Sequence, residues 1–122
     1  MKRDLEWFLR DILTACANIQ DFVQGMDYDA FLQDQKTSSA IIRQFEIIGE
    51  AAKNVSSSIK QNYSNIPWKD ISGMRDRLIH GYFGVDYYLV WDTIATKVPE
   101  LKESIQKILD DLTQQKDSES TV

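Results

Sequence analysis

Apolar side chains recur at every third or fourth position along four stretches of the chain, the spacing that gathers them on one face of an α-helix. No stretch alternates between apolar and polar residues as a half-buried strand does, and there is no internal repeat. Short polar segments separate the stretches. The pattern therefore predicts an all-α protein, an antiparallel bundle of four to five helices. The stretches are residues 3–25, 37–59, 68–79 and 86–112.

Residues that favour helix ends lie at the borders of these stretches. Gly25 is a candidate terminator of the first helix, and residues 27–29 predict a turn or cap before a short helical piece. The Thr and Ser side chains at 37–39 are candidate N-caps of the second helix. Pro67 suits the first turn of the third helix, and Asp86 is a candidate N-cap of the fourth.

Two residues interrupt the helical pattern. Gly49 costs about 1 kcal/mol relative to Ala inside a helix, so it predicts close packing against a neighbour. Pro99 predicts a kink or a restart of the last helix. Beyond a single domain at 1–113, the polar residues 114–122 predict a disordered tail.

The composition fits one globular domain: 122 residues, 43% of them hydrophobic and 27% charged. The single cysteine, Cys16, cannot form an internal disulfide and fits a small core position. With one Cys and one His, a zinc site is not expected, and we expect no cofactor. The first residues carry no apolar signal core, and no apolar run approaches the roughly 20 residues of a membrane span. We therefore expect a soluble, cytoplasmic protein without a membrane partner.

The net charge of −5 is distributed unevenly along the chain. Residues 1–34 and 83–122 each carry a net charge of −4, whereas residues 35–82 carry +3. A protein that binds nucleic acid duplexes in general is usually basic overall. Any contact with nucleic acid is therefore expected in the middle of the chain.

The only histidine of the chain lies in this basic middle segment, in the sequence Arg75-x-x-x-x-His80-x-Tyr82. This sequence resembles the motif of HepT toxins, which belong to the HEPN superfamily. Two longer blocks are also similar to that family: RQFEIIGEAAK at 43–53, and WKDISGMRDRLIHGYFGVD at 68–86, which is followed by Val90-Trp91. The resemblance covers most of residues 1–112.

The resemblance implies a HEPN-like helical bundle that forms a homodimer and acts on RNA as a metal-independent ribonuclease. It further implies the toxin of a type VII-like toxin–antitoxin pair. The partner would be a cognate minimal nucleotidyltransferase, which neutralises the toxin by adenylylating Tyr82.

The residues of the motif suit such chemistry. An imidazole takes and gives protons near neutral pH, so His80 is a candidate catalytic base or acid, and Arg75 is a candidate partner for phosphate oxygens. Attack by the 2′-OH would leave a 2′,3′-cyclic phosphate. One histidine cannot easily serve both as base and as acid for the leaving group, which favours a site shared between the two protomers of a dimer.

Helix geometry constrains how these side chains can meet. Five residues of straight helix leave Arg75 and His80 about 140° apart, so they converge only if the helix ends near His80. Asp76 lies four residues before His80 and is a candidate to orient the imidazole. Alternatively, His80 only satisfies free carbonyls at the helix C-terminus.

Glu46 and Glu50 are four residues apart on the second predicted helix. Together with Arg43 and Lys53 they fit ordinary ion pairs on the surface of a helix. Alternatively, Glu50 contacts and positions Arg75.

A different class of function is also compatible with the sequence. In this alternative, the chain is a non-catalytic HEPN adaptor that helps a partner nucleotidyltransferase to bind nucleotide or substrate. Arg75 and His80 would then hold a phosphate group without cleaving it.

Overall fold

The structure, a computed structural model, describes residues 2–80 and 84–120. In these two ranges the regular structure is helical, apart from one isolated antiparallel bridge between Ile79 and Val85. The predicted all-α class is therefore confirmed. The helices are α1 (Lys2–Phe22), α2 (Tyr28–Gln33), α3 (Gln35–Asn54), α4 (Ser57–Asn62), α5 (Trp68–Ser72), α6 (Met74–Leu78) and α7 (Tyr87–Ser120).

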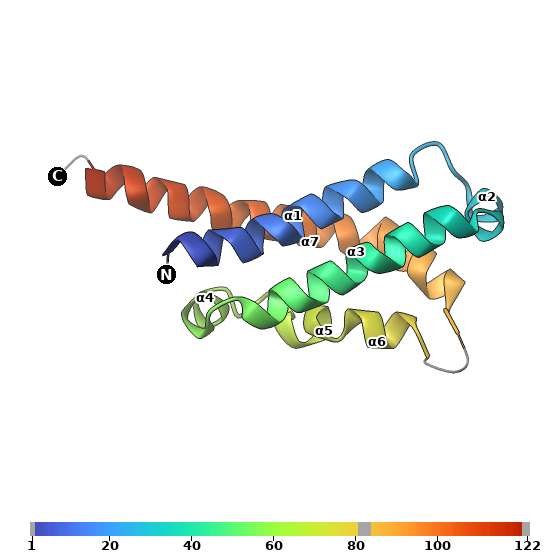
Figure 1. Cartoon of the computed structure of the whole chain (residues 1–122). Helices are drawn as coiled ribbons and strands as arrows, with labels where there is room; N and C mark the ends of the chain where they lie inside the picture. Colours follow the sequence, from blue (N-terminus) through green and yellow to red (C-terminus); the bar gives the residue numbers. More distant parts are fainter. Residues whose placement is uncertain (1, 81–83, 121–122) are drawn as a thin grey trace.

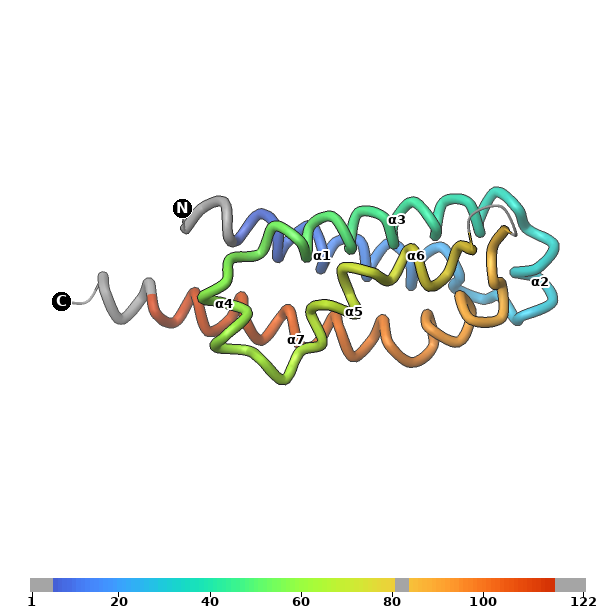
Figure 2. The backbone as a smooth tube through the Cα atoms, turned by 90° about the horizontal axis from the view of Figure 1, so that it is seen from below, coloured from blue at the N-terminus to red at the C-terminus, as the bar shows by residue number. Residues whose placement is uncertain are grey.

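The helices form an antiparallel bundle. The long helices α1, α3 and α7 lie along one another, with α1 packed against both α3 and α7 (Figure 1). Helices α5 and α6 follow each other in one direction and pack together against α3, so they act as the fourth rod (Figure 2). Successive rods run in opposite directions, which confirms the predicted bundle.

The core is formed by the apolar faces that the sequence pattern indicated. Cys16 is buried in it, as predicted. Trp68 is buried and its indole Nε1 donates a hydrogen bond of 3.1 Å to the carbonyl of Tyr63. The largest fully buried side chains are Phe31, Phe45, Leu9, Ile12, Ile19, Ile41, Ile48, Leu78, Ile105, Ile108, Val90 and Val98.

Gly49 lies where α3 crosses α5, and the close packing predicted there is confirmed. A Cβ atom at this position would stand 3.1 Å from the carbonyl oxygen of Ser72. The helix predicted at 68–79 is divided next to this contact, because α5 ends at Ser72 and α6 begins at Met74 with Gly73 between them.

The N-cap predicted for the second long helix is wrong. Asp34 caps α3 instead: its carboxylate accepts hydrogen bonds from the backbone N–H of Thr37 at 3.0 Å and from the Thr37 hydroxyl at 2.8 Å. Thr37 thus lies inside the first turn as the partner of the cap. Asp27 caps α2 as the turn signal suggested, and Gly25 adopts a φ of +79° just beyond α1.

Helix α7 also departs from the expectation. It continues through Pro99, so the restart predicted as one alternative there is wrong, and its bounds reach Ser120, within the segment for which a disordered tail is predicted. Pro99 removes the hydrogen bond to the carbonyl of Ala95, but Ala95 is exposed, so water can reach that side of the helix. Once a helix is formed, each further residue adds a hydrogen bond without a new nucleation cost.

No helix in the described part of the chain combines the length and the apolar character that crossing a membrane requires.

Candidate functional site

The Arg75–His80 segment lies where α6 ends and the chain turns back toward α7. Helix α6 stops at Leu78, and Ile79 is extended, with φ of −120° and ψ of 115°. The backbone N–H of His80 donates to the carbonyl of Gly84 at 2.9 Å, and that of Asp86 donates to Leu78 at 2.9 Å. These bonds and the bridge between Ile79 and Val85 pair residues 78–80 with residues 84–86, and we call the two paired segments the 78–86 hairpin.

The helix end removes the geometric obstacle between the two motif side chains. Arg75 belongs to α6, whereas His80 lies two residues beyond the end of α6, after the extended Ile79. The 140° separation of a continuous helix therefore does not apply to this pair. Arg75 and His80 are also both accessible, with 48% and 54% of their side chains exposed.

Asp86 is the nearest acidic partner of His80. One carboxylate oxygen of Asp86 lies 4.0 Å from Nε2 of His80. The other accepts a hydrogen bond of 3.1 Å from the backbone N–H of Leu89, which confirms Asp86 as the N-cap of α7. The same carboxylate thus fixes the start of α7 and faces the imidazole. Spacing along a helix could not reveal this contact, because it crosses a hairpin.

Within the described part of the chain, Asp76 and Glu50 do not form the ion pairs that the sequence analysis suggested for them. Asp76 lies 3.5 Å from the Arg75 guanidinium, and its carboxylate is largely exposed. Among the described residues, no ion pair joins Glu50 to Arg75 or Asp76 to His80. Glu46 forms a surface ion pair with Arg43 at 3.9 Å, as the simpler interpretation of this helix predicted.

Tyr82, the predicted adenylylation residue, lies outside the described residues. Across 2–80 and 84–120, no three His, Cys, Asp or Glu side chains gather in a group that could hold a metal ion.

A cavity of about 410 Å³ lies between the α5–α6 rod and α7. Its apolar lining includes Ile71, Met74 and Leu101, with Arg77 and Lys97 among its charged residues. Neither Arg75 nor His80 lines it, so the cavity is separate from the motif side chains.

The bundle presents an arginine on a short helix and an exposed histidine on the hairpin after it. The chain belongs to the HepT-like ribonuclease family: the model of the family described as "Ribonuclease HepT-like" matches residues 12–108. That match includes both similar blocks of the sequence and the whole 78–86 hairpin.

Individual relatives agree with this assignment. A candidate RNase of Methanocaldococcus jannaschii, MJ0125, is 46% identical over 111 residues, which cover 91% of this chain and 96% of the relative. A protein of Thermococcus cleftensis named as a probable ribonuclease HepT is 43% identical over 108 residues, which cover 88% and 98% of the two chains. No solved structure gives a significant match.

Proposed function

We propose that this protein is a metal-independent endoribonuclease in which His80 and Arg75 carry the reaction. The observation that supports this proposal most strongly is the position of His80. Its side chain is exposed on the 78–86 hairpin, directly after the helix that carries Arg75, and the Asp86 carboxylate lies 4.0 Å from its Nε2. The names of the relatives, which describe RNases, support the same reaction class.

The reaction needs two proton transfers and one site of charge stabilisation. His80 takes the proton of a ribose 2′-OH, the 2′-oxygen attacks the adjacent phosphorus, and the bond from phosphorus to the 5′-oxygen breaks. Arg75 stabilises the negative charge on the phosphate oxygens in the transition state. The product is a 2′,3′-cyclic phosphate, and the 5′-oxygen leaves with a proton from a second acid.

A homodimer supplies that second acid as the His80 of the other protomer. Two motif segments near a two-fold axis give a cleft with two imidazoles and two guanidinium groups. The uncompensated positive charge of the middle segment then faces the substrate, while the acidic α1 and α7 lie toward solvent.

We further propose that the enzyme is a toxin controlled by a cognate minimal nucleotidyltransferase. Adenylylation of Tyr82, two residues after His80, adds a phosphate group that pairs with Arg75 and competes with RNA. This part of the proposal rests on the motif and the family assignment. The Tyr82→Phe variant keeps the ring, loses the acceptor hydroxyl, and is expected to cleave RNA while resisting the nucleotidyltransferase.

The test of the reaction is RNA cleavage by the purified protein in excess EDTA. We expect cleavage to continue, to leave 2′,3′-cyclic ends, and to fall by about 10²-fold or more in His80→Ala, the usual range for loss of a general acid or base. A substrate with 2′-deoxyribose at the cut should not react. Cleavage that stops with EDTA and returns with a divalent ion would contradict the mechanism, and RNA binding without cleavage would favour the adaptor function.

A further inference from the structure

Charge is segregated between the two sides of the bundle. Residues 35–80, which form α3 to α6, contain seven Lys and Arg against four Asp and Glu, a net charge of +3. The remainder of the chain, with α1 and α7, carries −8. Of this charge, α1 contributes −1, α7 contributes −3, and the residues around α2 and the start of α7 contribute the remainder. A polyanion is therefore expected to approach the side formed by α3 to α6 more readily than α1 or α7.

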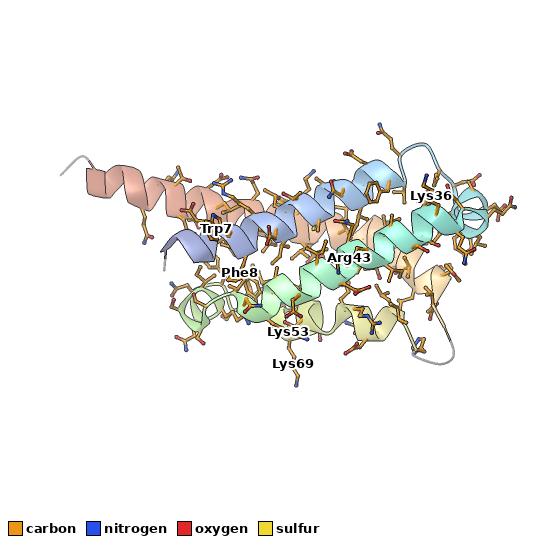
Figure 3. The ribbon with its side chains drawn as sticks, viewed as in Figure 1. Trp7, Phe8, Lys36, Arg43, Lys53 and Lys69 are labelled. Carbon is orange, nitrogen blue, oxygen red and sulfur yellow. The ribbon has the colours of Figure 1, made fainter. Side chains whose placement is uncertain are left out.

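Four exposed cations lie along this side, and we call them the basic row: Lys36, Arg43, Lys53 and Lys69. Lys36 and Arg43 are seven residues apart on α3 and so point to nearly the same side, and the three α3 cations span about 25 Å of helix. Figure 3 shows the row running along α3 from its α2 end and continuing to Lys69 on α5.

The cations of the row are available to a ligand. Within the described residues, Lys36, Lys53 and Lys69 form no ion pair within 4.0 Å. Arg43 has one, with Glu46 at 3.9 Å, and because the Arg43 side chain is 68% exposed, water screens this pair strongly. Exposed Glu50, seven residues after Arg43, lies on the same face of α3 between Arg43 and Lys53, and exposed Asp70 follows Lys69 directly. The row therefore offers separate phosphate contacts and not a continuous basic surface.

Most of the row and Arg75 lie on neighbouring helices. Helix α6, which carries Arg75, packs directly against α3, and the α5–α6 rod follows α3 along its length (Figure 2). A single strand that lies on the row therefore runs along the element that supports the motif. Contacts to phosphates of this kind position a strand without reading its sequence.

We infer that the basic row binds the sugar–phosphate backbone of single-stranded RNA and guides it to His80 and Arg75. This inference rests on the proposed function for the identity of the ligand. Its test, however, measures binding and does not require cleavage, so the two can fail separately.

The experiment measures fluorescence anisotropy of a labelled, fully 2′-O-methylated single-stranded RNA, which the proposed mechanism cannot cleave, over a range of salt concentrations. The test variant is Arg43→Gln/Lys53→Gln. The matched control is Lys97→Gln/Lys107→Gln on α7, which changes the net charge by the same amount at two exposed positions. A third variant, Arg43→Lys/Lys53→Arg, keeps both charges.

We expect the α3 double variant to bind about tenfold more weakly and to lower the slope of log K against log salt by about 1.4, since each phosphate contact on a single strand contributes about 0.7. The α7 double variant should change the affinity less than twofold, and the charge-conserving variant should bind as the wild type does. All three should retain the helical circular dichroism of the wild type.

Equal losses in the two double variants would mean that only net charge matters and would overturn the inference. Full RNA binding by the α3 double variant would also overturn the inference. If that variant at the same time loses self-association in sedimentation, the row is a protein interface and not an RNA-binding surface. If the wild type binds through the row but cleaves no RNA under any condition, the inference stands and the proposed reaction fails.

Discussion

Asp86 uses its two carboxylate oxygens for two different purposes, and one substitution can separate them. Asn is as good an N-cap as Asp, so Asp86→Asn should keep the bond to the Leu89 N–H and the stability of α7. It removes the negative charge that faces His80. We expect cleavage to fall about tenfold, which is less than the 10²–10⁴-fold that a general acid or base contributes in full.

The comparison with Asp86→Ala makes this prediction specific. Ala removes both contacts, so it should lower the melting temperature as well as the rate. Steady-state cleavage and thermal melting of the two variants provide the check. An Asp86→Asn protein with full activity would show that the carboxylate does not position His80.

Tyr63 should make stability sensitive to alkaline pH. Burial, helped by the hydrogen bond of 2.6 Å that its hydroxyl donates to the Asp111 carboxylate, raises the pKa of Tyr63 from 10.0 to about 12. The folded state thus holds this proton more tightly than the unfolded state. The stabilisation is complete below pH 10 and is lost as the pH rises toward 12.

We therefore expect Tyr63→Phe to lose about 1 kcal/mol of unfolding free energy at neutral pH, the usual net value of such a hydrogen bond. The difference from the wild type should shrink steadily above pH 10. Urea unfolding of both proteins across this range tests it. A difference that is constant with pH would show that the phenol proton is not involved.

The sequence singles out candidate side chains for the site but not all of the contacts that they make. Arg75 and His80 could be singled out because the chain has one histidine and the surrounding blocks resemble a family. The contact of His80 with Asp86 could not, because helical spacing describes neighbours on one helix and this pair spans a hairpin. Helical spacing likewise makes Asp76 a candidate to orient His80, whereas its carboxylate lies 3.5 Å from the Arg75 guanidinium.

At the scale of elements, apolar periodicity located all four rods, whereas the ends depended on local hydrogen bonds. Asp34 and the residues at 37–39 are all residue types that favour the N-cap position. Only the hydrogen bonds from Thr37 to the Asp34 carboxylate identify Asp34 as the N-cap of α3. The break at Gly73 was missed because a short helix of five residues is too brief for periodicity to delimit. The break between α5 and α6 lies next to the close contact of Ser72 with Gly49, which only the structure shows.

The close packing of α3 against α5 can be tested by substitution at Gly49. A Leu side chain there must displace the backbone of Ser72, since even a Cβ would stand 3.1 Å from its carbonyl oxygen. We expect Gly49→Leu to lower the free energy of unfolding by about 1–3 kcal/mol, as overpacking does. Ser39→Leu, at an exposed position of the same helix, should change it by less than about 0.5 kcal/mol.

Chemical denaturation of the two variants gives both values. If Gly49→Leu is as stable as Ser39→Leu, α5 can move away at little cost, and the contact does not hold the rod in place.

At the scale of the whole molecule, the proposed site requires both protomers of a dimer. When wild-type protein exchanges subunits with an equal amount of His80→Ala, about half of the wild-type chains acquire a variant partner, by random pairing in a two-fold dimer. If each cleft needs two imidazoles, about half of the original activity is lost. Independent sites would lose none.

Subunit exchange must be verified with differently tagged chains before activity is measured, and sedimentation should show a dimer at micromolar concentration. A monomer in sedimentation, or full activity after complete exchange, would contradict the shared site.

The burial of Cys16 provides a practical route to that dimer. The side chain is fully enclosed in the core, and burial raises the pKa of its thiol to about 12, so at neutral pH it is both inaccessible and protonated. A spin label or fluorophore should therefore attach only to a cysteine introduced at an exposed position such as Ser39 or Lys107, without prior replacement of the native one. Each protomer would then carry one probe, and a single distance between probes would report how the two copies are arranged.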